Sequence, residues 1–230
     1  EVDEEVMEMF DVDIENMNDA QSCSEYVNDI YRYLHAAQRK YMVGTYLKTQ
    51  SDINSNMTSI LLDWLVEVSE EDHLTNETLH LAKHYIERFL NAHKVARSRL
   101  QLVGVCGMLI AAKFEEVFPP GVDDFVYISD NTFTRAQVIE TETLILSTLN
   151  WDLTNPTVLD FLNRYVRVSN ADAVTTTLAK YLSEIALLDY PMSSFLPSHV
   201  ALACLMLASH AHRITPALHK SLYVFIGDGE

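Results

Sequence analysis

The chain has 230 residues, of which 48% are hydrophobic, and its 16 basic and 33 acidic residues give a formal net charge of −17. A protein this acidic does not bind nucleic acid through bulk charge and is repelled by anionic membranes, and no run of residues is long and apolar enough to span a bilayer. The three cysteines are odd in number, which favours reduced thiols in a cytosolic or nuclear protein over a disulfide framework.

The N-terminal region is predicted to be an acidic flexible leader over residues 1–23, followed over residues 24–54 by a helix and a polar connector. Apolar and aromatic side chains recur at helical spacing in this helix, and Tyr26, Ile30 and Tyr33 are among them. A lone amphipathic helix must cover its apolar face, so we expect it to lie either on its own domain or on a partner. Periodicity alone does not decide between the two.

Residues 57–71 predict a helix whose apolar arc is much wider than the roughly 100° of an ordinary surface helix. One stripe on the helical wheel consists of Met57, Ile60, Leu61, Trp64 and Val68. We expect either that the helix is central to the core or that this stripe stays accessible, beside the carboxylates of Asp63 and Glu67. An accessible stripe would suit a ligand with an apolar anchor and a nearby positive charge.

The next predicted helix, over residues 76–91, carries His80 and His84 four positions apart, with Glu77 nearby. Such a trio could hold a metal ion. Neither an HExxH motif nor a cysteine pair supports a metal site, so we expect a solvated helix face at these residues and no metal or cofactor. A helical metalloenzyme is the alternative from a different functional class.

The segment 100–116 is the centre of the predicted core, because residues 102–112 include no charged or strongly polar side chain. A helix that is apolar all round is buried on all sides. Gly104, Gly107 and Ala111 share one face, where small residues allow a neighbouring helix to approach closely. The four residues that end the run lie where the core meets the surface: Lys113, Phe114, Glu115 and Glu116.

The chain then repeats itself with a constant offset of 97 residues, since 159 − 62 and 178 − 81 are both 97. The motif Leu-Asp-Trp-Leu at 62–65 returns as Leu-Asp-Phe-Leu at 159–162, and Leu-Ala-Lys at 81–83 returns at 178–180. A constant offset across three helices indicates duplication of one helical unit of about 95 residues.

Three charged positions break the repeat, and we look for function there. At the same offset, the counterparts of Lys113, Glu115 and Glu67 are His210, His212 and Arg164. The sequence has no glycine-rich nucleotide loop, nucleophile elbow or zinc-ligand spacing. An acidic, all-helical, duplicated chain without a catalytic constellation is typical of a binding module.

Seven stretches of the chain, in order over residues 25–157, carry a family resemblance. They are EYVNDIYRYL at 25–34, MTSILLDWLVEVSEE at 57–71, NETLHLAKHYIERFL at 76–90, RLQLVG at 99–104, AAKFEEVFPP at 111–120, FVYISDNTFT at 125–134 and LNWDLTNPT at 149–157. On these motifs the chain resembles the mitotic cyclins, the A-type more than the B-type, although TLAKYLSEIALLDY at 177–190 is also similar to B-type sequences.

The resemblance implies an all-α fold of two tandem cyclin boxes, each of five helices, preceded by the N-terminal helix. The first box is expected over residues 55–152 and the second over residues 153–230. The second box is expected to be incomplete and to lack its last helix, because the sequence ends at Glu230. We therefore expect that the chain is truncated there or that its tail is atypical, and because the first residue is not a methionine we expect the chain to be a fragment.

The resemblance also implies a protein that is not itself an enzyme but a regulatory subunit, which binds and activates a cyclin-dependent protein kinase in the nucleus and cytoplasm. The residues that match the family's kinase-binding positions are Tyr26, Ile30, Tyr33, Lys113, Phe114, Glu115, Glu142, Leu146 and Trp151. In the family, the charged members of this set contact the kinase near its regulatory helix.

A second implied site is a docking groove for substrates and inhibitors that carry an Arg-x-Leu segment. The matching positions are Met57, Ile60, Leu61, Trp64, Glu67, Arg97, Leu100 and Gln101. This set includes most of the apolar stripe described above, with Glu67 able to accept the arginine of the ligand. The arginine that usually follows Met57 is Thr58 here, and we expect only a charge at the rim of the groove to be lost.

Another function is compatible with the same fold. A cyclin-fold scaffold or a transcription-related binding module would share the architecture without activating a kinase. A net charge of −17 disfavours the basic surface that a transcription factor needs, and the implied partners include neither nucleic acid nor a membrane. The sequence names neither the kinase, nor its substrates, nor the phase of the cell cycle.

Overall fold

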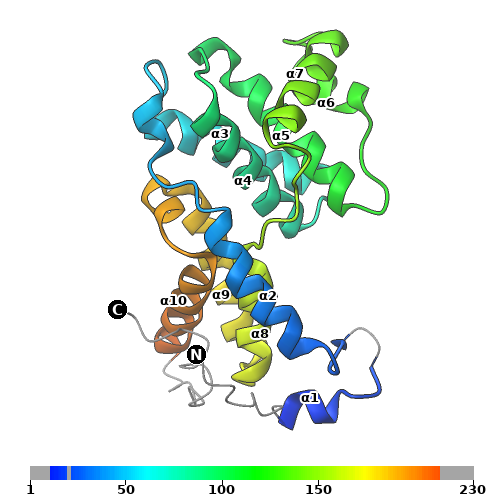
Figure 1. Ribbon diagram of the computed structural model, residues 1–230, viewed down its shortest axis with the longest axis vertical. Coiled ribbons are helices and arrows are strands. Elements are labelled where there is room, and N and C mark those ends of the chain that lie inside the picture. The colour runs from blue at the N-terminus through cyan, green and yellow to red at the C-terminus, as the bar shows by residue number, and fades with distance from the viewer. Residues whose placement is uncertain (1–10, 20–21, 213–230) are drawn as a thin grey trace.

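The computed structural model describes residues 11–19 and 22–212, and every regular element in these ranges is a helix (Figure 1). The α-helices are α1 (Asp11–Glu15), α2 (Val27–Lys40), α3 (Ser55–Glu71), α4 (Asn76–Ala92), α5 (Leu100–Glu115), α6 (Val122–Ile128), α7 (Arg135–Thr148), α8 (Val158–Val168), α9 (Ala173–Leu188) and α10 (Pro197–Ala211). Short 3-10 turns occur at η2 (Tyr46–Thr49), η3 (Arg97–Arg99) and η4 (Tyr190–Ser194). The predicted all-helical fold is confirmed for this part of the chain.

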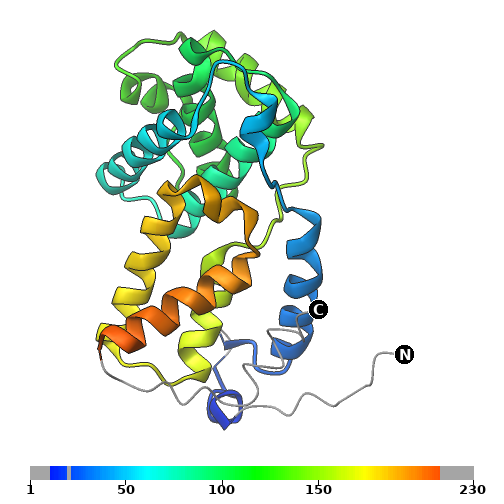
Figure 2. The same ribbon diagram turned by 90° about the vertical axis from the view of Figure 1, so that its left-hand side faces the viewer.

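The helices form two groups, α3–α7 and α8–α10, which follow one another along the long axis of the molecule (Figures 1 and 2). Each group encloses its own cluster of buried apolar side chains. Helices α9 and α10 begin 97 residues after α4 and α5, since 173 − 76 and 197 − 100 are both 97. Helix α10 packs against α8 and α9 as α5 packs against α3 and α4, so the predicted duplication is confirmed.

Helix α5 is the centre of the first group. Every residue from Leu102 to Ala112 is buried, and α5 packs against α3, α4 and α7. A Cβ added at Gly104 would lie 2.6 Å from Cδ1 of Leu61 in α3, and one added at Gly107 would lie 2.5 Å from Cγ1 of Ile86 in α4. The predicted role of the small residues, to let neighbouring helices approach, is confirmed.

Hydrogen bonds at the N-termini fix where several helices begin. The Thr134 hydroxyl accepts the backbone N–H of Gln137 in α7, and the Gln137 side chain accepts the N–H of Thr134 in return. Thr157 and Asp160 form the same reciprocal pair at the start of α8. Such caps satisfy backbone donors that have no partner within the helix, and each contributes about 1 kcal/mol.

One face of α2 lies on the second group of helices (Figure 1). Tyr31 and Leu34 pack against its core, and the Tyr31 hydroxyl donates to the carbonyl of Asp160 at 3.0 Å. Near the other end of α2, the side chain of Gln38 accepts the backbone N–H of Ser198 at 3.1 Å. The helix therefore lies on its own domain, which periodicity alone did not decide.

The described part of the expected leader is attached to the fold. Asp13 in α1 is 2% exposed and pairs with Arg164 of α8 through two hydrogen bonds of 2.5 and 2.7 Å. This bidentate pair differs from the expectation of a flexible leader, and it was not foreseen because its two members are 151 residues apart in the sequence. Residues 1–10 and 20–21 of the leader, and the expected loss of a last helix after residue 212, lie outside the described residues.

We expect Gly107→Ala to destabilise the fold by about 1–3 kcal/mol, because the added methyl group would overlap Cγ1 of Ile86, close to the backbone of α4. Gly104→Ala is the matched comparison. Its methyl group would meet the end of the Leu61 side chain, which can turn away, and alanine favours a helix over glycine by up to about 1 kcal/mol. The free energy of unfolding measured in urea should therefore be clearly lower for Gly107→Ala than for Gly104→Ala. Equal stability of the two variants would show that α4 and α5 can separate without cost.

Candidate functional site

An ion pair joins the end of α5 to α7 at the surface. Lys113 Nζ lies 2.6 Å from Oε1 of Glu142. Glu142 is 9% exposed, whereas the Lys113 side chain is 43% exposed. The structure thus brings together two charged residues of the predicted kinase-binding set, with the carboxylate enclosed by protein and the ammonium group open to solvent.

Cys106 lies in α5 near this pair and is unreactive. Its thiol donates to the carbonyl of Val138 at 3.4 Å. Burial raises the pKa of Cys106 to about 12, and the negative charge of Glu142 adds to the rise. The thiol therefore stays protonated at neutral pH, where it is a poor nucleophile. All three cysteines of the chain are free thiols.

Exposed apolar side chains accompany the ion pair. Phe114 directly follows Lys113 and is 46% exposed, and Trp151 is 68% exposed. The backbone N–H of Trp151 donates to the carbonyl of Leu146 at 3.0 Å, one helical turn after Glu142. Four further exposed apolar residues were not singled out as site residues from the sequence: Val117 and Phe118 after α5, and Ile139 and Leu144 on α7.

Asp152 connects the end of α7 to α2 and α4. Its carboxylate lies 2.7 Å from Lys40 Nζ and accepts the Tyr41 hydroxyl at 2.7 Å, while its carbonyl accepts an N–H of Arg88 at 2.7 Å. The hydrogen bond from Lys40, and then that from Tyr41, lowers the pKa of Asp152 to about 2, so it stays ionised. The neighbouring Trp151 has a left-handed φ of 59°, which turns the chain between the two boxes at this point.

The outer face of α2 carries the three aromatic and apolar residues predicted for partner binding. Tyr26 is 60%, Ile30 39% and Tyr33 58% exposed. They are spaced by four and three residues, so they share one side of the helix. Because the opposite side packs on the second box, α2 has two apolar faces and only one of them is covered.

The two glutamates that end α5 behave differently. Glu115 is exposed, and partial burial together with the charges of Glu116 and Asp160 raises its pKa. Glu116 accepts the backbone N–H of Thr75 at 2.7 Å and the Thr78 hydroxyl at 2.6 Å. Burial opposes ionisation of Glu116, but these hydrogen bonds outweigh it and lower its pKa. Glu116 thus ties the end of α5 to the start of α4, a role that sequence reasoning missed.

A third carboxylate, Glu77 in the first turn of α4, lies where the two boxes meet. Burial raises the pKa of Glu77 to about 7. The charge of Asp160 on α8 adds to the rise, a hydrogen bond with Thr157 opposes it, and the charge of Glu115 adds a smaller amount. Near neutral pH this group is therefore only partly ionised.

The apolar stripe of α3 is accessible along one edge. Ile60 is 62% exposed, Met57 and Trp64 are half-buried and Glu67 is exposed, whereas Leu61 is buried against Gly104. Of the other predicted groove residues, Arg97 is exposed, Gln101 is half-buried and Leu100 is buried. The helix is thus neither fully enclosed nor an ordinary surface helix, and its exposed apolar edge runs beside a carboxylate.

The interpretation of Thr58 as a lost rim charge is wrong. Thr58 is 3% exposed, and its hydroxyl donates to the carbonyl of Ser55 at 2.8 Å. The residue therefore faces the core. Its neighbour Ser59 donates to the carbonyl of Leu188 at 2.6 Å and so joins α3 to the second box.

The expectation of a solvated face at His80 and His84 is also wrong. His80 is 4% exposed, and burial, with a smaller effect of the Lys83 charge, lowers the pKa of both imidazoles to about 3. Both rings are neutral at physiological pH. Among the described residues, no group of three or more His, Cys, Asp or Glu side chains is arranged to hold a metal ion, so the metalloenzyme alternative has no ligand set there.

Comparison with known families finds two matching domains. The cyclin N-terminal domain matches residues 29–154, and the cyclin C-terminal domain matches residues 156–225. The G2/mitotic-specific cyclin-B of Hydra viridissima is 42% identical over 202 residues, which cover 88% of this chain and 52% of the relative. Cyclin-A2 of Gallus gallus is 48% identical over 189 residues, which cover 81% of this chain and 48% of the relative. The chain thus spans about half the length of these relatives, and the two subtypes match it similarly.

Solved structures show the same fold at low identity. A viral cyclin from herpesvirus saimiri superposes with a TM-score of 0.77 at 19% identity, over 86% of this chain and 90% of that one. A chain of the yeast RNA Pol II CTD kinase CTDK-1 complex gives a TM-score of 0.68 at 15% identity, over 84% of this chain and 66% of that one. Within residues 11–19 and 22–212, no helix is of a length and hydropathy that would let it cross a membrane.

We expect Glu77→Gln to stabilise the protein at alkaline pH. The folded-state pKa of about 7 exceeds the ordinary value of 4.5, so the folded state binds this proton more tightly than the unfolded state does, and stability falls as pH rises between these values. Glutamine cannot ionise and removes that loss, which is at most about 3 kcal/mol at pH 8. The measurement is the unfolding free energy of both proteins between about pH 5 and pH 8.

The control for this experiment is Glu140→Gln, at an exposed carboxylate of α7. It should leave the pH dependence of stability as in the wild type. If Glu77→Gln showed the same pH dependence as the wild type and this control, the carboxyl of Glu77 would ionise normally in the folded protein.

Proposed function

Because this chain belongs to the cyclin family, with mitotic A- and B-type cyclins among its relatives, we propose that it binds and activates a cyclin-dependent protein kinase in cell-cycle control. The observation that carries the proposal is the Lys113–Glu142 pair amid exposed apolar side chains. The counterpart of Lys113 in the second box is His210, so this charged position is not repeated. Two structures of similar fold belong to larger assemblies, the yeast RNA Pol II CTD kinase CTDK-1 complex and the CAK complex of Chaetomium thermophilum bound to ATP-γ-S. The second gives a TM-score of 0.52.

The proposed role is that of a regulatory subunit, which supplies binding energy and no catalytic group. A kinase becomes active when its regulatory helix brings a glutamate to the lysine that holds ATP. Lys113 and Glu142 would form charge-assisted hydrogen bonds to the kinase backbone near that helix, with Glu115 beside them. Phe114, Leu146 and Trp151 would bury apolar surface, and the outer face of α2 would add a second contact.

We also propose that α3 recruits substrates and inhibitors that carry an Arg-x-Leu segment. The exposed edge of α3 offers Ile60 and the half-buried Trp64 to a leucine-sized anchor, whose burial contributes roughly 1.5–3 kcal/mol. Glu67 lies one turn after Trp64 and can pair with the arginine. Such an exposed pair is worth less than about 1 kcal/mol, so docking is weak and depends more on the leucine.

Lys113→Ala combined with Glu142→Ala is expected to weaken kinase binding by about two decades or more, because two charge-assisted hydrogen bonds of roughly 1.5–3 kcal/mol each are lost. The matched control is Arg135→Ala with Asp123→Ala, which removes an exposed ion pair of 3.0 Å between α6 and α7. Affinity for a kinase co-purified from an extract of dividing cells should fall only in the first variant. Unchanged affinity there would overturn the kinase-site assignment.

Replacing Ile60 by serine should abolish binding of a fluorescent Arg-x-Leu peptide while leaving kinase affinity and the melting temperature unchanged, because Ile60 is 62% exposed. Trp64→Ala should also abolish peptide binding, at some cost in stability because Trp64 packs partly on the core. Glu67→Gln should weaken binding by less than about fivefold, and more at low salt, where its charge is least screened.

The charge control for the peptide titration is Glu140→Gln on α7, which should bind the peptide as the wild type does. Undiminished binding in both Ile60→Ser and Trp64→Ala would rule out docking on α3. Loss of kinase binding in Ile60→Ser would mean that this edge of α3 belongs to the kinase interface instead.

A further inference from the structure

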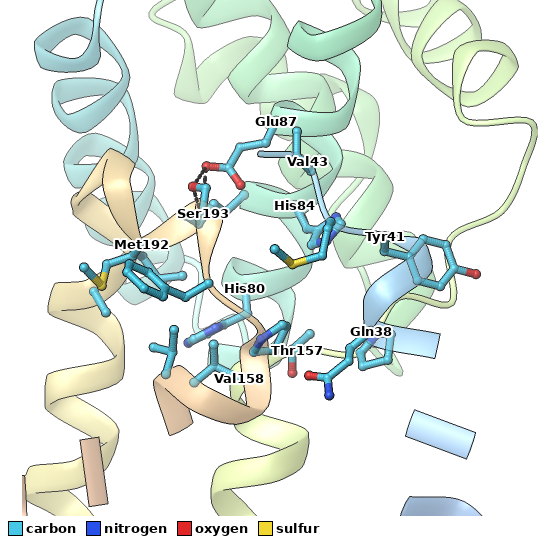
Figure 3. Close-up of a pocket in the computed structure, with 18 of the residues that line it drawn as sticks. Gln38, Tyr41, Val43, His80, His84, Glu87, Thr157, Val158, Met192 and Ser193 are labelled. Atoms are coloured by element: carbon cyan, nitrogen blue, oxygen red, sulfur yellow. Dashed lines mark hydrogen bonds and ion pairs between the residues drawn. The ribbon is translucent and has the colours of Figure 1, made fainter. Parts of the chain in front are cut away.

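A pocket lies where α4 of the first box faces the second box and the chain that follows α2 (Figure 3). Its cavity is about 70 Å³ and opens to solvent at one side. Several separate parts of the chain form its walls, among them Tyr41 and Val43 after α2, His80 and His84 on α4, Val158 at the start of α8, and Met192 of η4. Helices α9 and α10 also contribute to the lining. The pocket is distinct from both surfaces proposed above, since none of their residues lines it.

Two of the histidines that line this pocket each have a buried ring nitrogen with no hydrogen-bond partner among the described residues. These nitrogens are Nε2 of His80 and Nδ1 of His84. Buried polar groups in proteins are nearly always satisfied, so unpartnered nitrogens on two histidines that lie one helical turn apart and line the same cavity require an explanation. Both rings are neutral because burial lowers the pKa of each to about 3, and a neutral imidazole offers one donor and one acceptor.

The other groups around the cavity leave no free charge. Lys83 Nζ lies 2.7 Å from Oε1 of Glu87, and Ser193 donates to the same carboxylate oxygen at 2.5 Å (Figure 3). Lys83 also donates to the Ser193 hydroxyl at 2.9 Å. These three residues satisfy one another. The remaining lining is mostly apolar, so an ion would find no uncompensated partner, and entering the pocket would remove its water.

We propose that this pocket binds a small uncharged molecule with one apolar ring and at least one hydroxyl or N–H group. The polar group would hydrogen-bond to the free nitrogens of His80 and His84, and the ring would lie against the apolar walls. The cavity is several times the roughly 10–15 Å³ that holds one water, and smaller than the roughly 150 Å³ that encloses benzene. The polar end of the ligand therefore enters the cavity and part of the ring stays in its mouth.

Such a ligand would act as a brace between the two boxes. The pocket walls come from α2 and its connector and from α4, and on the other side from the start of α8, from α9, and from η4 and α10. A molecule that contacts all of them binds only when these parts are in their present positions, so it stabilises that arrangement by mass action. A metabolite or a synthetic compound bound at this site would therefore stabilise the present arrangement of the two boxes.

The test uses phenol as the probe, with toluene and benzoate as matched controls, on the whole chain labelled with ¹⁵N. Nitrogen-detected spectra of the histidine rings should show phenol shifting His80 and His84, with a Kd on the order of 1 mM. The exposed His73 and His93 are internal controls and should not move. Toluene, which has no hydroxyl group, should bind at least fivefold more weakly, and benzoate should not bind because it is charged.

Two variants test the site directly. Ala186→Phe, in the wall contributed by α9, should block phenol binding. His80→Phe with His84→Phe should abolish the preference for phenol over toluene. If the double variant does not fold, the comparison of the three probes on the wild type still decides the question. Shifts confined to other histidines, equal affinity for phenol and toluene, or no binding up to about 20 mM would each overturn the proposal.

Discussion

Enclosure of α5 is the constraint on which the rest of the first box depends. A helix without a polar face is stable only if other helices surround it, and here α3, α4 and α7 do so, with Gly104 and Gly107 permitting direct contact. The charged end of α5 must then emerge where this enclosure stops. Lys113 therefore meets Glu142, which belongs to one of the enclosing helices. The position of the candidate site follows from the packing of the core.

Duplication explains why the two boxes share a scaffold and differ in use. Glu67 on α3 is exposed beside an apolar edge, whereas Arg164, its counterpart on α8, is buried in a pair with Asp13. The same position of the repeat is thus exposed to solvent in the first box, whereas in the second box it is covered by the N-terminal segment of the chain. Removing one partner of such a buried pair costs several kcal/mol, since it leaves an uncompensated charge. The second box is in this respect closed to an outside ligand where the first is open.

The sequence was sufficient to predict the features that depend on local pattern. The uninterrupted apolar run of α5, the small-residue face and the 97-residue register of the helices all follow from spacing along the chain. The errors concern what covers a side chain. His80 and Thr58 are polar residues on helix faces that are buried by the second box and by the region of η2. The hydrogen bond from the start of α4 to the Glu116 carboxylate was not predicted. Periodicity identifies a face, but it does not show which distant segment packs on it.

The covered and uncovered faces of α2 bear on how a partner would be bound. Its inner face is held by the second box, and its C-terminal end is held at Asp152 by Lys40 and Tyr41. The carbonyl of the same aspartate accepts a hydrogen bond from Arg88 of the first box, and the residue before it is Trp151. The exposed side of α2 and the surface at the end of α7 are therefore parts of one body. A partner that contacts both surfaces binds two elements that are already ordered. The loss of conformational entropy on association is therefore smaller than for a helix that folds only when it meets its partner.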